Sequence, residues 1–212
     1  MENPGKLLHV GCGPKRLAQT TRFFREGQWQ ETRLDIDPAV QPDVLGSLTD
    51  MGAIPDASMQ AVFSSHNLEH LYPHEVPKAL AEMRRVLDAR GVLVLTCPDL
   101  QSVAQRVADD QLLEPAYHSP AGPIAPLDML YGHRPAMAAG NLFMAHRCGF
   151  TLRVLMGVVR QAGFAAMAGL RRPELFDLWV VATADARAEA DMKALLLAQF
   201  APVVAQQGGT NG

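Results

Sequence analysis

Cysteine is scarce in this chain, and its spacing provides no framework. The 212 residues include only three cysteines, Cys12, Cys97 and Cys148, and no Cys-x-x-Cys pair. An odd number of widely spaced cysteines indicates neither a disulfide scaffold nor a structural zinc knuckle. Such usage is typical of a reducing compartment, so we expect a cytoplasmic location.

The sequence also lacks a long apolar run and an excess of positive charge. No segment approaches the roughly 18 consecutive apolar residues that a membrane helix needs, and no basic start leads into an apolar stretch as in a signal peptide. Lys and Arg number 19 against 22 Asp and Glu, which gives a net charge of -3. This balance argues against a general electrostatic grip on nucleic acid. We therefore expect neither a membrane nor a nucleic-acid partner.

Apolar residues are plentiful enough for one core. They make up 48% of the sequence, which suits a single domain over residues 1–212. Short apolar runs predict strands at "KLLHV", "ETRLDI", "AVFSS", "GVLVLT" and "LWVVATA". Helical spacing predicts helices over 74–91, closed by Gly91, over 151–163 and over 190–200. The alternation predicts a doubly wound α/β fold with a mostly parallel sheet.

Residues 113–149 break this alternation. The segment holds five prolines and four glycines with little periodicity, and it is too long for an ordinary connection. We interpret it as a lid or binding insertion between the fifth strand and the following helix. The alternative is a surface loop or an oligomer contact, which leaves a homodimer open. Residues 201–212 are expected to form a flexible tail.

A Gly-Cys-Gly turn follows the first predicted strand. Gly11 and Gly13 would let the backbone approach a ligand at the carboxyl end of the sheet. Asp35 lies 22 positions after Gly13, at the end of the second strand, where a carboxylate can accept from both ribose hydroxyls. The third glycine of a dinucleotide fingerprint is replaced by Arg16, which disfavours a nicotinamide-dependent oxidoreductase. The pattern predicts a nucleoside-bearing ligand.

Five segments together resemble a known family. "LLHVGCGPKRL", "LDIDP", "PDVLGSLTD", "IPDASMQAVFSSHNLEHL" and "RRVLDARGVLVLTCPDL" resemble class I S-adenosylmethionine-dependent methyltransferases, in the type 11 subgroup that includes ubiquinone and menaquinone biosynthesis enzymes. The resemblance covers roughly residues 5 to 100. It implies a Rossmann-like, seven-stranded sheet, divided here into a cofactor-binding core over 5–112, the insertion over 113–149 and the rest of the sheet over 150–200. It also implies S-adenosyl-L-methionine as cofactor and a small-molecule acceptor as partner.

The resemblance assigns cofactor contacts residue by residue. They are Gly11, Cys12, Gly13, Asp35, Ile36, Ser47, Leu48, Ser64, Ser65 and His66. The chain departs from the family pattern at His9, where many members have an acid, at Lys15, where they have a third glycine, and at Ser47, where an aspartate is frequent. These departures keep open a non-catalytic member that binds S-adenosylmethionine or S-adenosylhomocysteine as a regulator or partner subunit.

The donor determines what the protein must supply. A sulfonium already makes its methyl group electrophilic, so the protein chiefly holds the acceptor in line. A hydroxyl or ammonium acceptor would also need a base, and the candidates are His66, His133 and His146. In the insertion we expect acceptor contacts from Tyr117, Tyr131, Arg134 and Arg147. The two arginines favour an acceptor that bears a carboxylate or phosphate.

The segment "HNLEH" allows a metal interpretation. His66, Glu69 and His70 match the His-x-x-Glu-His order of inverted zinc peptidases. So short a pattern arises readily by chance, and Leu-Glu-His at this place is common in the resembled family without a metal. We therefore expect no metal here.

Overall fold

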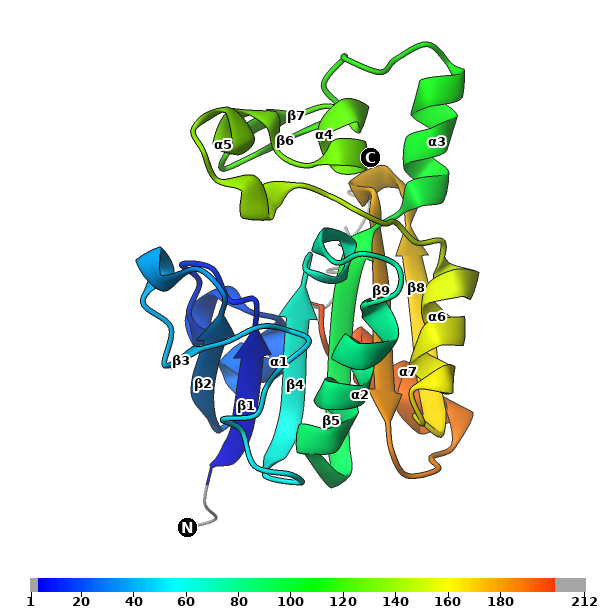
Figure 1. The fold of residues 1–212 in the computed structure, drawn as a ribbon. Coiled ribbons are helices and arrows are strands. Elements are labelled where there is room, and N and C mark those ends of the chain that lie inside the picture. The colour runs from blue at the N-terminus through cyan, green and yellow to red at the C-terminus, as the bar shows by residue number, and fades with distance from the viewer. Residues whose placement is uncertain (1–3, 201–212) are drawn as a thin grey trace, which may run out of the picture.

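A seven-stranded sheet forms the centre of the molecule (Figure 1). The computed structural model describes residues 4–200. The strand order is β3-β2-β1-β4-β5-β9-β8, and β9 is antiparallel to both of its neighbours while the other pairings are parallel. The strands are β1 (Gly5–Val10), β2 (Trp29–Asp35), β3 (Val44–Leu45), β4 (Met59–Ser65), β5 (Leu87–Pro98), β8 (Ala166–Arg172) and β9 (Asp177–Thr183). The predicted doubly wound, mostly parallel fold is confirmed.

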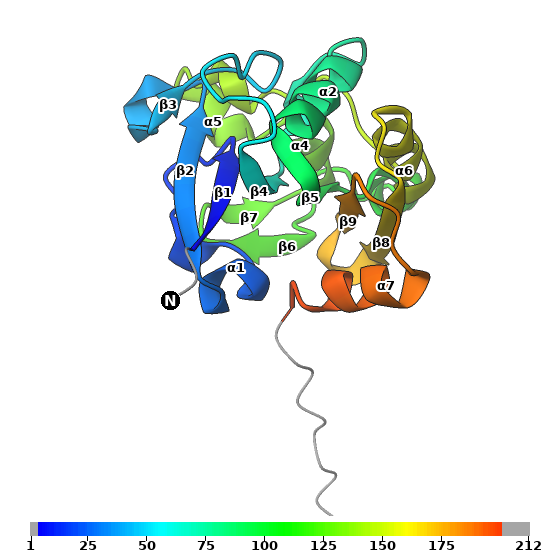
Figure 2. The same ribbon diagram turned by 90° about the horizontal axis from the view of Figure 1, so that it is seen from below.

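Helices bury both faces of the sheet (Figure 2). Helices α1 (Arg22–Glu26) and α7 (Glu189–Leu197) cover one face, and α2 (Val76–Val86) and α6 (Leu152–Gln161) cover the other. Successive strand residues point to opposite faces, so each strand contributes to both cores. The α2 and α6 side buries Leu8, Val10, Val62, Leu80, Met83, Leu93, Leu155 and Val159. The α1 and α7 side buries Leu7, Phe24, Ala61, Phe63, Val94, Val181, Met192 and Leu196.

Helix α2 ends earlier than its sequence pattern predicts. The prediction closed it at Gly91, but the structure ends it at Val86 and begins β5 at Leu87. Two of the last helical carbonyls accept from the backbone N–H groups of Ala57 and Ser58, at 2.9 and 3.0 Å. Leu87 then pairs with β4, and residues 88–91 bulge before the regular pairing resumes. Tertiary hydrogen bonds replace the predicted glycine cap.

The insertion lies over the carboxyl ends of the strands (Figure 1). It follows β5, as predicted, but only after a helix that was not predicted, α3 (Leu100–Ala108), and it is more ordered than a loop. A hairpin, β6 (Tyr117–Ser119) and β7 (Gly122–Ile124), precedes the short helices α4 (Pro126–Tyr131) and α5 (Arg134–Ala138). Its own apolar contacts, centred on Val103, Ile124 and Met129, hold it against α3.

The last residues of the insertion form hydrogen bonds with the turn that follows β4. The N–H groups of Arg147 and Cys148 donate to the carbonyl of Glu69, at 2.8 and 3.2 Å. In addition, Nδ1 of His70 lies 3.1 Å from the carbonyl oxygen of Ala145. These bonds place the insertion beside the sheet edge where parallel α/β folds bind ligands. Within residues 4–200, every helix is too short or too polar to cross a membrane.

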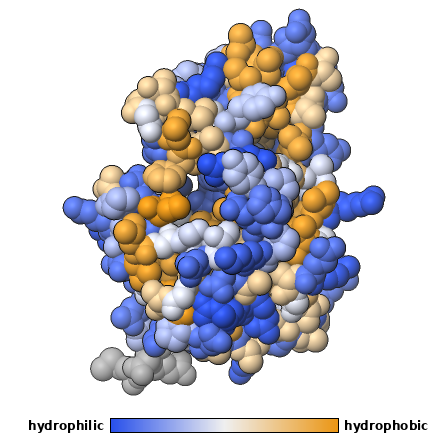
Figure 3. Space-filling model, in the orientation of Figure 1, coloured by the Kyte–Doolittle hydropathy of each residue, from blue (hydrophilic) through white to orange (hydrophobic). Residues whose placement is uncertain are grey.

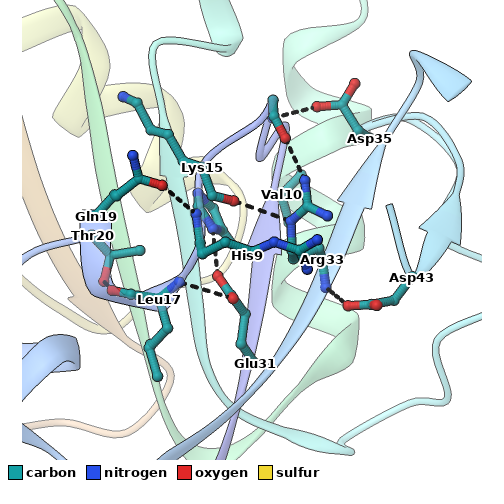
Figure 4. Close-up of polar contacts among 12 residues, drawn as sticks. His9, Val10, Lys15, Leu17, Gln19, Thr20, Glu31, Arg33, Asp35 and Asp43 are labelled. Carbon is teal, nitrogen blue, oxygen red and sulfur yellow. Dashed lines mark hydrogen bonds and ion pairs between the residues drawn. The ribbon is translucent and has the colours of Figure 1, made fainter. Parts of the chain in front are cut away.

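Arg33 connects the two loops that follow β1 and β2, and Figure 4 shows its contacts with the first of these loops. Its side chain is buried, with 1% of the residue exposed. The guanidinium donates to the carbonyls of Gly13 and Lys15 in the first loop and of Val40 and Gln41 in the second. A single buried cation therefore holds both loops in position.

Replacing Arg33 with methionine should destabilise the fold. The change leaves four partly buried carbonyls without their guanidinium donor, and each unsatisfied group costs about 1–3 kcal/mol. We expect the Arg33→Met variant to lose at least about 3 kcal/mol of unfolding free energy in urea titrations. Arg25→Met, on an exposed position of α1, serves as the control and should change it by less than about 0.5 kcal/mol. Equal stabilities of the two variants would contradict this role.

Candidate functional site

A cavity of about 360 Å³ opens at the carboxyl ends of β1, β2 and β4, beneath the insertion. We refer to it as the first cavity. The space-filling view shows the molecule hollowed between the insertion and the sheet (Figure 3). The walls of the first cavity include nine of the ten predicted cofactor residues: Gly11, Cys12, Gly13, Asp35, Ile36, Ser47, Leu48, Ser65 and His66. The tenth, Ser64, is buried behind the wall, where its hydroxyl oxygen accepts from the Asn67 amide at 3.1 Å.

The glycine turn takes a backbone shape that side chains oppose. Gly11 and Gly13 have φ angles of 60° and 53°, in the left-handed region. A Cβ on Gly11 would overlap the side chain of Asn67, whose amide donates to the carbonyl of Val10 at 3.0 Å. A Cβ on Gly13 would meet no atom within 4 Å. The first glycine is thus required by packing, and the second leaves its backbone open to the cavity.

Asp35 forms the wall of the first cavity that faces the glycine turn. Its carboxylate accepts from the N–H of Gly13 at 2.7 Å and from the N–H of Asp37 at 2.9 Å. Two backbone donors leave further lone pairs on the same carboxylate for a ligand. Ile36 follows with 47% of its surface exposed beside the cavity. The pair offers an anionic acceptor next to an apolar face.

His9 is paired with an acid from the neighbouring strand. Its Nδ1 lies 2.8 Å from Oε1 of Glu31, and the other oxygen of Glu31 accepts from the N–H of Leu17 at 2.9 Å (Figure 4). Burial lowers the pKa of His9, so the ring is neutral at neutral pH. A neutral ring that donates from Nδ1 to the carboxylate keeps a lone pair on Nε2. The sequence shows that position 9 lacks the family's acid. It does not show that Glu31, on the neighbouring strand, lies beside His9 in its place.

The remaining polar positions of the first cavity are modest acceptors. The hydroxyl of Ser47 lies 3.0 Å from that of Thr49. The nearby Asp50 caps a local turn by accepting from the N–H of Gly52 at 3.1 Å and is not among the lining residues. Burial raises the pKa of the Cys12 thiol to about 11, so Cys12 presents a neutral thiol rather than a thiolate nucleophile.

A second cavity of about 140 Å³ lies between the turn after β4 and the insertion. Residues from both regions line it: His66, Glu69, His70, Pro98, Tyr117, Ile124, Asp128, Met129, His133, Met144, His146 and Phe176. Three of these residues, His66, His70 and Met144, also line the first cavity. The two cavities therefore share a wall.

The three candidate bases occupy different places around this wall. His66 is exposed, has a φ of 57°, and lies on the shared wall with Nδ1 3.4 Å from the carboxylate of Glu69. His133 lines the second cavity, and its Nε2 is buried without a hydrogen-bond partner among the described residues. Nδ1 of His146 lies 2.8 Å from the carbonyl oxygen of Met129, and burial lowers the pKa of this histidine. Of these three histidines, only His66 lines both cavities.

The sequence pointed to Glu69 only as part of the HNLEH pattern, without its contact to His146. Glu69 is 1% exposed, and neither carboxylate oxygen has a hydrogen-bond partner among residues 4–200. Burial alone would raise its pKa, but the surrounding histidines, His66 first, outweigh burial and lower it. The rings of His70 and His146 lie beside it, 4.8 Å apart between centroids. Their 76-residue separation hides the cluster in the sequence; no local spacing signals it.

The predicted acceptor contacts separate into two groups. Tyr117 lines the second cavity, and Arg147 lines the first, where it donates to the carbonyl of His70 at 2.7 Å. Tyr131 lies away from these two cavities and is 62% exposed. Arg134 is held by Asp128 through two hydrogen bonds of 2.7 and 3.0 Å, and this arginine lowers the pKa of Asp128 to about 2. The guanidinium of Arg134, which we expected to bind an anionic acceptor, is therefore already paired with Asp128.

The strand order, the antiparallel β9 and the cavity at the strand ends define the class I methyltransferase fold. Residues 8–95 match the family model described as a methyltransferase domain. Over residues 8–95 the chain thus resembles methyltransferase domains, and its fold is that of S-adenosylmethionine-dependent methyltransferases. No curated protein sequence matches the chain at a significant level.

Solved structures share this fold at low sequence identity. A methyltransferase from Thermotoga maritima, described as a possible histamine N-methyltransferase, is 14% identical with a TM-score of 0.55, over 85% of this chain and 82% of the other. The 1,6-didemethyltoxoflavin N1-methyltransferase of Burkholderia thailandensis, solved with that compound and S-adenosylhomocysteine, is 18% identical with a TM-score of 0.53, over 86% and 72%. A TehB-like methyltransferase from Corynebacterium glutamicum is 16% identical with a TM-score of 0.53, over 87% and 83%.

The two glycines should differ in their tolerance of alanine. Both substitutions impose a left-handed backbone on a side chain, which costs about 1–2 kcal/mol. Gly11→Ala also overlaps Asn67, and overpacking of this kind adds about 1–3 kcal/mol. We expect chemical denaturation to show Gly11→Ala as the less stable variant by at least about 1 kcal/mol. A Gly13→Ala variant of equal or lower stability would show that Asn67 moves aside without cost.

Proposed function

We propose that the protein transfers a methyl group from S-adenosylmethionine in the first cavity to a small-molecule acceptor in the second. The observation that supports this most directly is the shared wall of His66, His70 and Met144. Methyl transfer requires donor and acceptor to meet in line, and two adjoining cavities satisfy that requirement.

The first cavity fits the cofactor in size and chemistry. Its volume of about 360 Å³ falls within the usual range for ligand sites. When bound, S-adenosylmethionine supplies an electrophilic methyl group. On this proposal, Asp35 accepts from the ribose hydroxyls, Ile36 packs against the adenine, and the open backbone at Gly13 allows close approach.

His9 resolves the departure from the family pattern. With its Nδ1 proton directed to Glu31, the ring presents the Nε2 lone pair, which can accept from the ammonium of the methionyl group. The negative charge of Glu31 strengthens that acceptor through the ring. His9 on β1 and Glu31 on β2 thus together supply the hydrogen-bond acceptor that a single acid at position 9 would supply.

The second cavity holds the acceptor on this proposal. Tyr117 and His133 come from the insertion and His66 from the turn after β4, so the insertion selects the acceptor while the sheet positions the donor. His66 is the best-placed base because it faces both cavities and has a carboxylate behind its ring. Of the two arginines expected to bind an anionic acceptor, Arg134 is paired with Asp128 and Arg147 lines the first cavity rather than the second.

Two ligands separate the roles of Asp35 and His9. S-adenosylhomocysteine carries the ribose and the amino-acid end, whereas methylthioadenosine lacks the latter. We expect Asp35→Ala to weaken both ligands ten- to a hundredfold by calorimetry, since a hydrogen bond to a charged group contributes about 1.5–3 kcal/mol. His9→Leu should weaken S-adenosylhomocysteine about tenfold and methylthioadenosine less than about twofold.

Asp56→Ala, which removes an exposed acid with 77% of its side chain accessible, is the control and should leave both affinities unchanged. Equal weakening of the two ligands by His9→Leu would refute the assignment to the ammonium. Unchanged affinities in a folded Asp35→Ala variant would refute the ribose contact.

Filling the second cavity should stop transfer without preventing cofactor binding. We expect His133→Trp to reduce transfer of a labelled methyl group into a small-molecule extract at least about a hundredfold, because the indole occupies the acceptor's space. Affinity for S-adenosylhomocysteine should stay within about threefold. The matched control is Leu113→Trp, at an insertion position that is 61% exposed.

Retained transfer in a folded His133→Trp variant would move the acceptor to another surface. A wild-type chain that binds S-adenosylhomocysteine but labels nothing in the extract would favour the non-catalytic alternative, a regulatory or partner protein.

A further inference from the structure

The carboxylate of Glu69 lacks the donors that a buried charge requires. It is 1% exposed, and neither oxygen has a hydrogen-bond partner among the described residues. Nδ1 of His66 lies 3.4 Å from Oε1 of Glu69, beyond good hydrogen-bond length. Buried carboxylates are retained in proteins when they are paired or coordinate a metal. The side chain therefore points to a positively charged partner.

Two imidazoles beside Glu69 each have one ring nitrogen without a hydrogen-bond partner among residues 4–200. Nδ1 of His70 lies 3.1 Å from the carbonyl oxygen of Ala145, and Nδ1 of His146 lies 2.8 Å from that of Met129. A carbonyl can only accept, so each ring donates from Nδ1 and keeps the Nε2 lone pair. Metal-binding histidines are oriented in this way, with the second nitrogen donating to a carbonyl or carboxylate.

We propose that Glu69, His70 and His146 bind a divalent transition-metal ion, with Zn²⁺ as the preferred occupant. Each residue offers one ligand atom, and these atoms all lie within 4.8 Å of one another. Ligands of a tetrahedral Zn²⁺ stand about 3.3 Å apart, so binding needs side-chain movements on the order of 1 Å. The sequence expectation of no metal omitted His146, which only the fold brings to the site.

The donor set decides the class of ion. Two imidazole nitrogens and one carboxylate suit Zn²⁺ and its neighbours, whereas Mg²⁺ and Ca²⁺ require a shell of oxygens. Three protein ligands leave a fourth position open, and all three residues line the second cavity. The site goes beyond the proposed function, because methyl transfer from a sulfonium has no inherent need of a metal.

The test uses the full chain stripped with a chelator and then titrated with Zn²⁺ or Co²⁺. We expect one ion per chain and, with Co²⁺, visible absorption bands of a four- or five-coordinate site. Glu69→Gln and His146→Ala should each weaken binding at least about tenfold. His74→Ala, which removes an exposed histidine outside the cluster, should leave it unchanged.

Glu69→Gln also tests the effect of this side chain on stability, because it removes a buried negative charge that no hydrogen-bond donor among residues 4–200 contacts. We expect the metal-free variant to melt no lower than the metal-free wild type. Absence of stoichiometric Zn²⁺ binding, or binding that Glu69→Gln leaves intact, would overturn the proposal and assign the carboxylate to His66 as its ion-pair partner. S-adenosylhomocysteine affinity measured on the same samples reports separately on the proposed function.

Discussion

The buried guanidinium of Arg33 is the contact on which the geometry of the first cavity depends. The loops after β1 and β2 carry the glycine turn and Asp35, and neither loop contains a regular element long enough to hold itself in place. Arg33 binds carbonyls from both, so the distance between the two walls is fixed by one rigid side chain. The hydrogen bond from Gly13 to Asp35 then sets the fine position of the carboxylate.

The turn after β4 has the corresponding role for the second cavity. Asn67 fills the space beside Gly11, Glu69 faces the insertion, and His66 stands in a strained backbone conformation between them. Backbone strain at a non-glycine residue persists only where the surroundings over-determine it, and it is concentrated at functional sites. One short turn thus joins the glycine turn of the first cavity to the floor of the second.

Much of the fold was predictable because its strands are nearly continuous apolar runs and its glycine turn has a distinctive pattern. β8, with the sequence AMAGLRR, escaped prediction because it has neither alternation nor β-branched residues. The end of α2 was misplaced because hydrogen bonds from Ala57 and Ser58 override a local glycine signal.

The first cavity was predictable because its residues lie in sequence-local motifs at strand ends. The second cavity was less so, because it depends on contacts between distant segments. The sequence indicated a lid, but not that Arg134 would be bound by Asp128 or that His146 would stand beside Glu69. Paired charges and clustered rings of this kind follow from tertiary packing, which no local spacing encodes.

The bonds that fasten the insertion to the turn after β4 also govern how the second cavity can open. The N–H groups of Arg147 and Cys148 share the carbonyl of Glu69, so the last residues of the insertion cannot lift without releasing the backbone of a residue that lines the cavity. Opening and loss of the cavity's shape are then one local unfolding event. Local openings of this kind range in free energy from near zero up to that of global unfolding. The rate at which molecules enter or leave through this side of the site therefore depends on how easily this segment unfolds locally. That in turn depends on the strength of a few backbone hydrogen bonds.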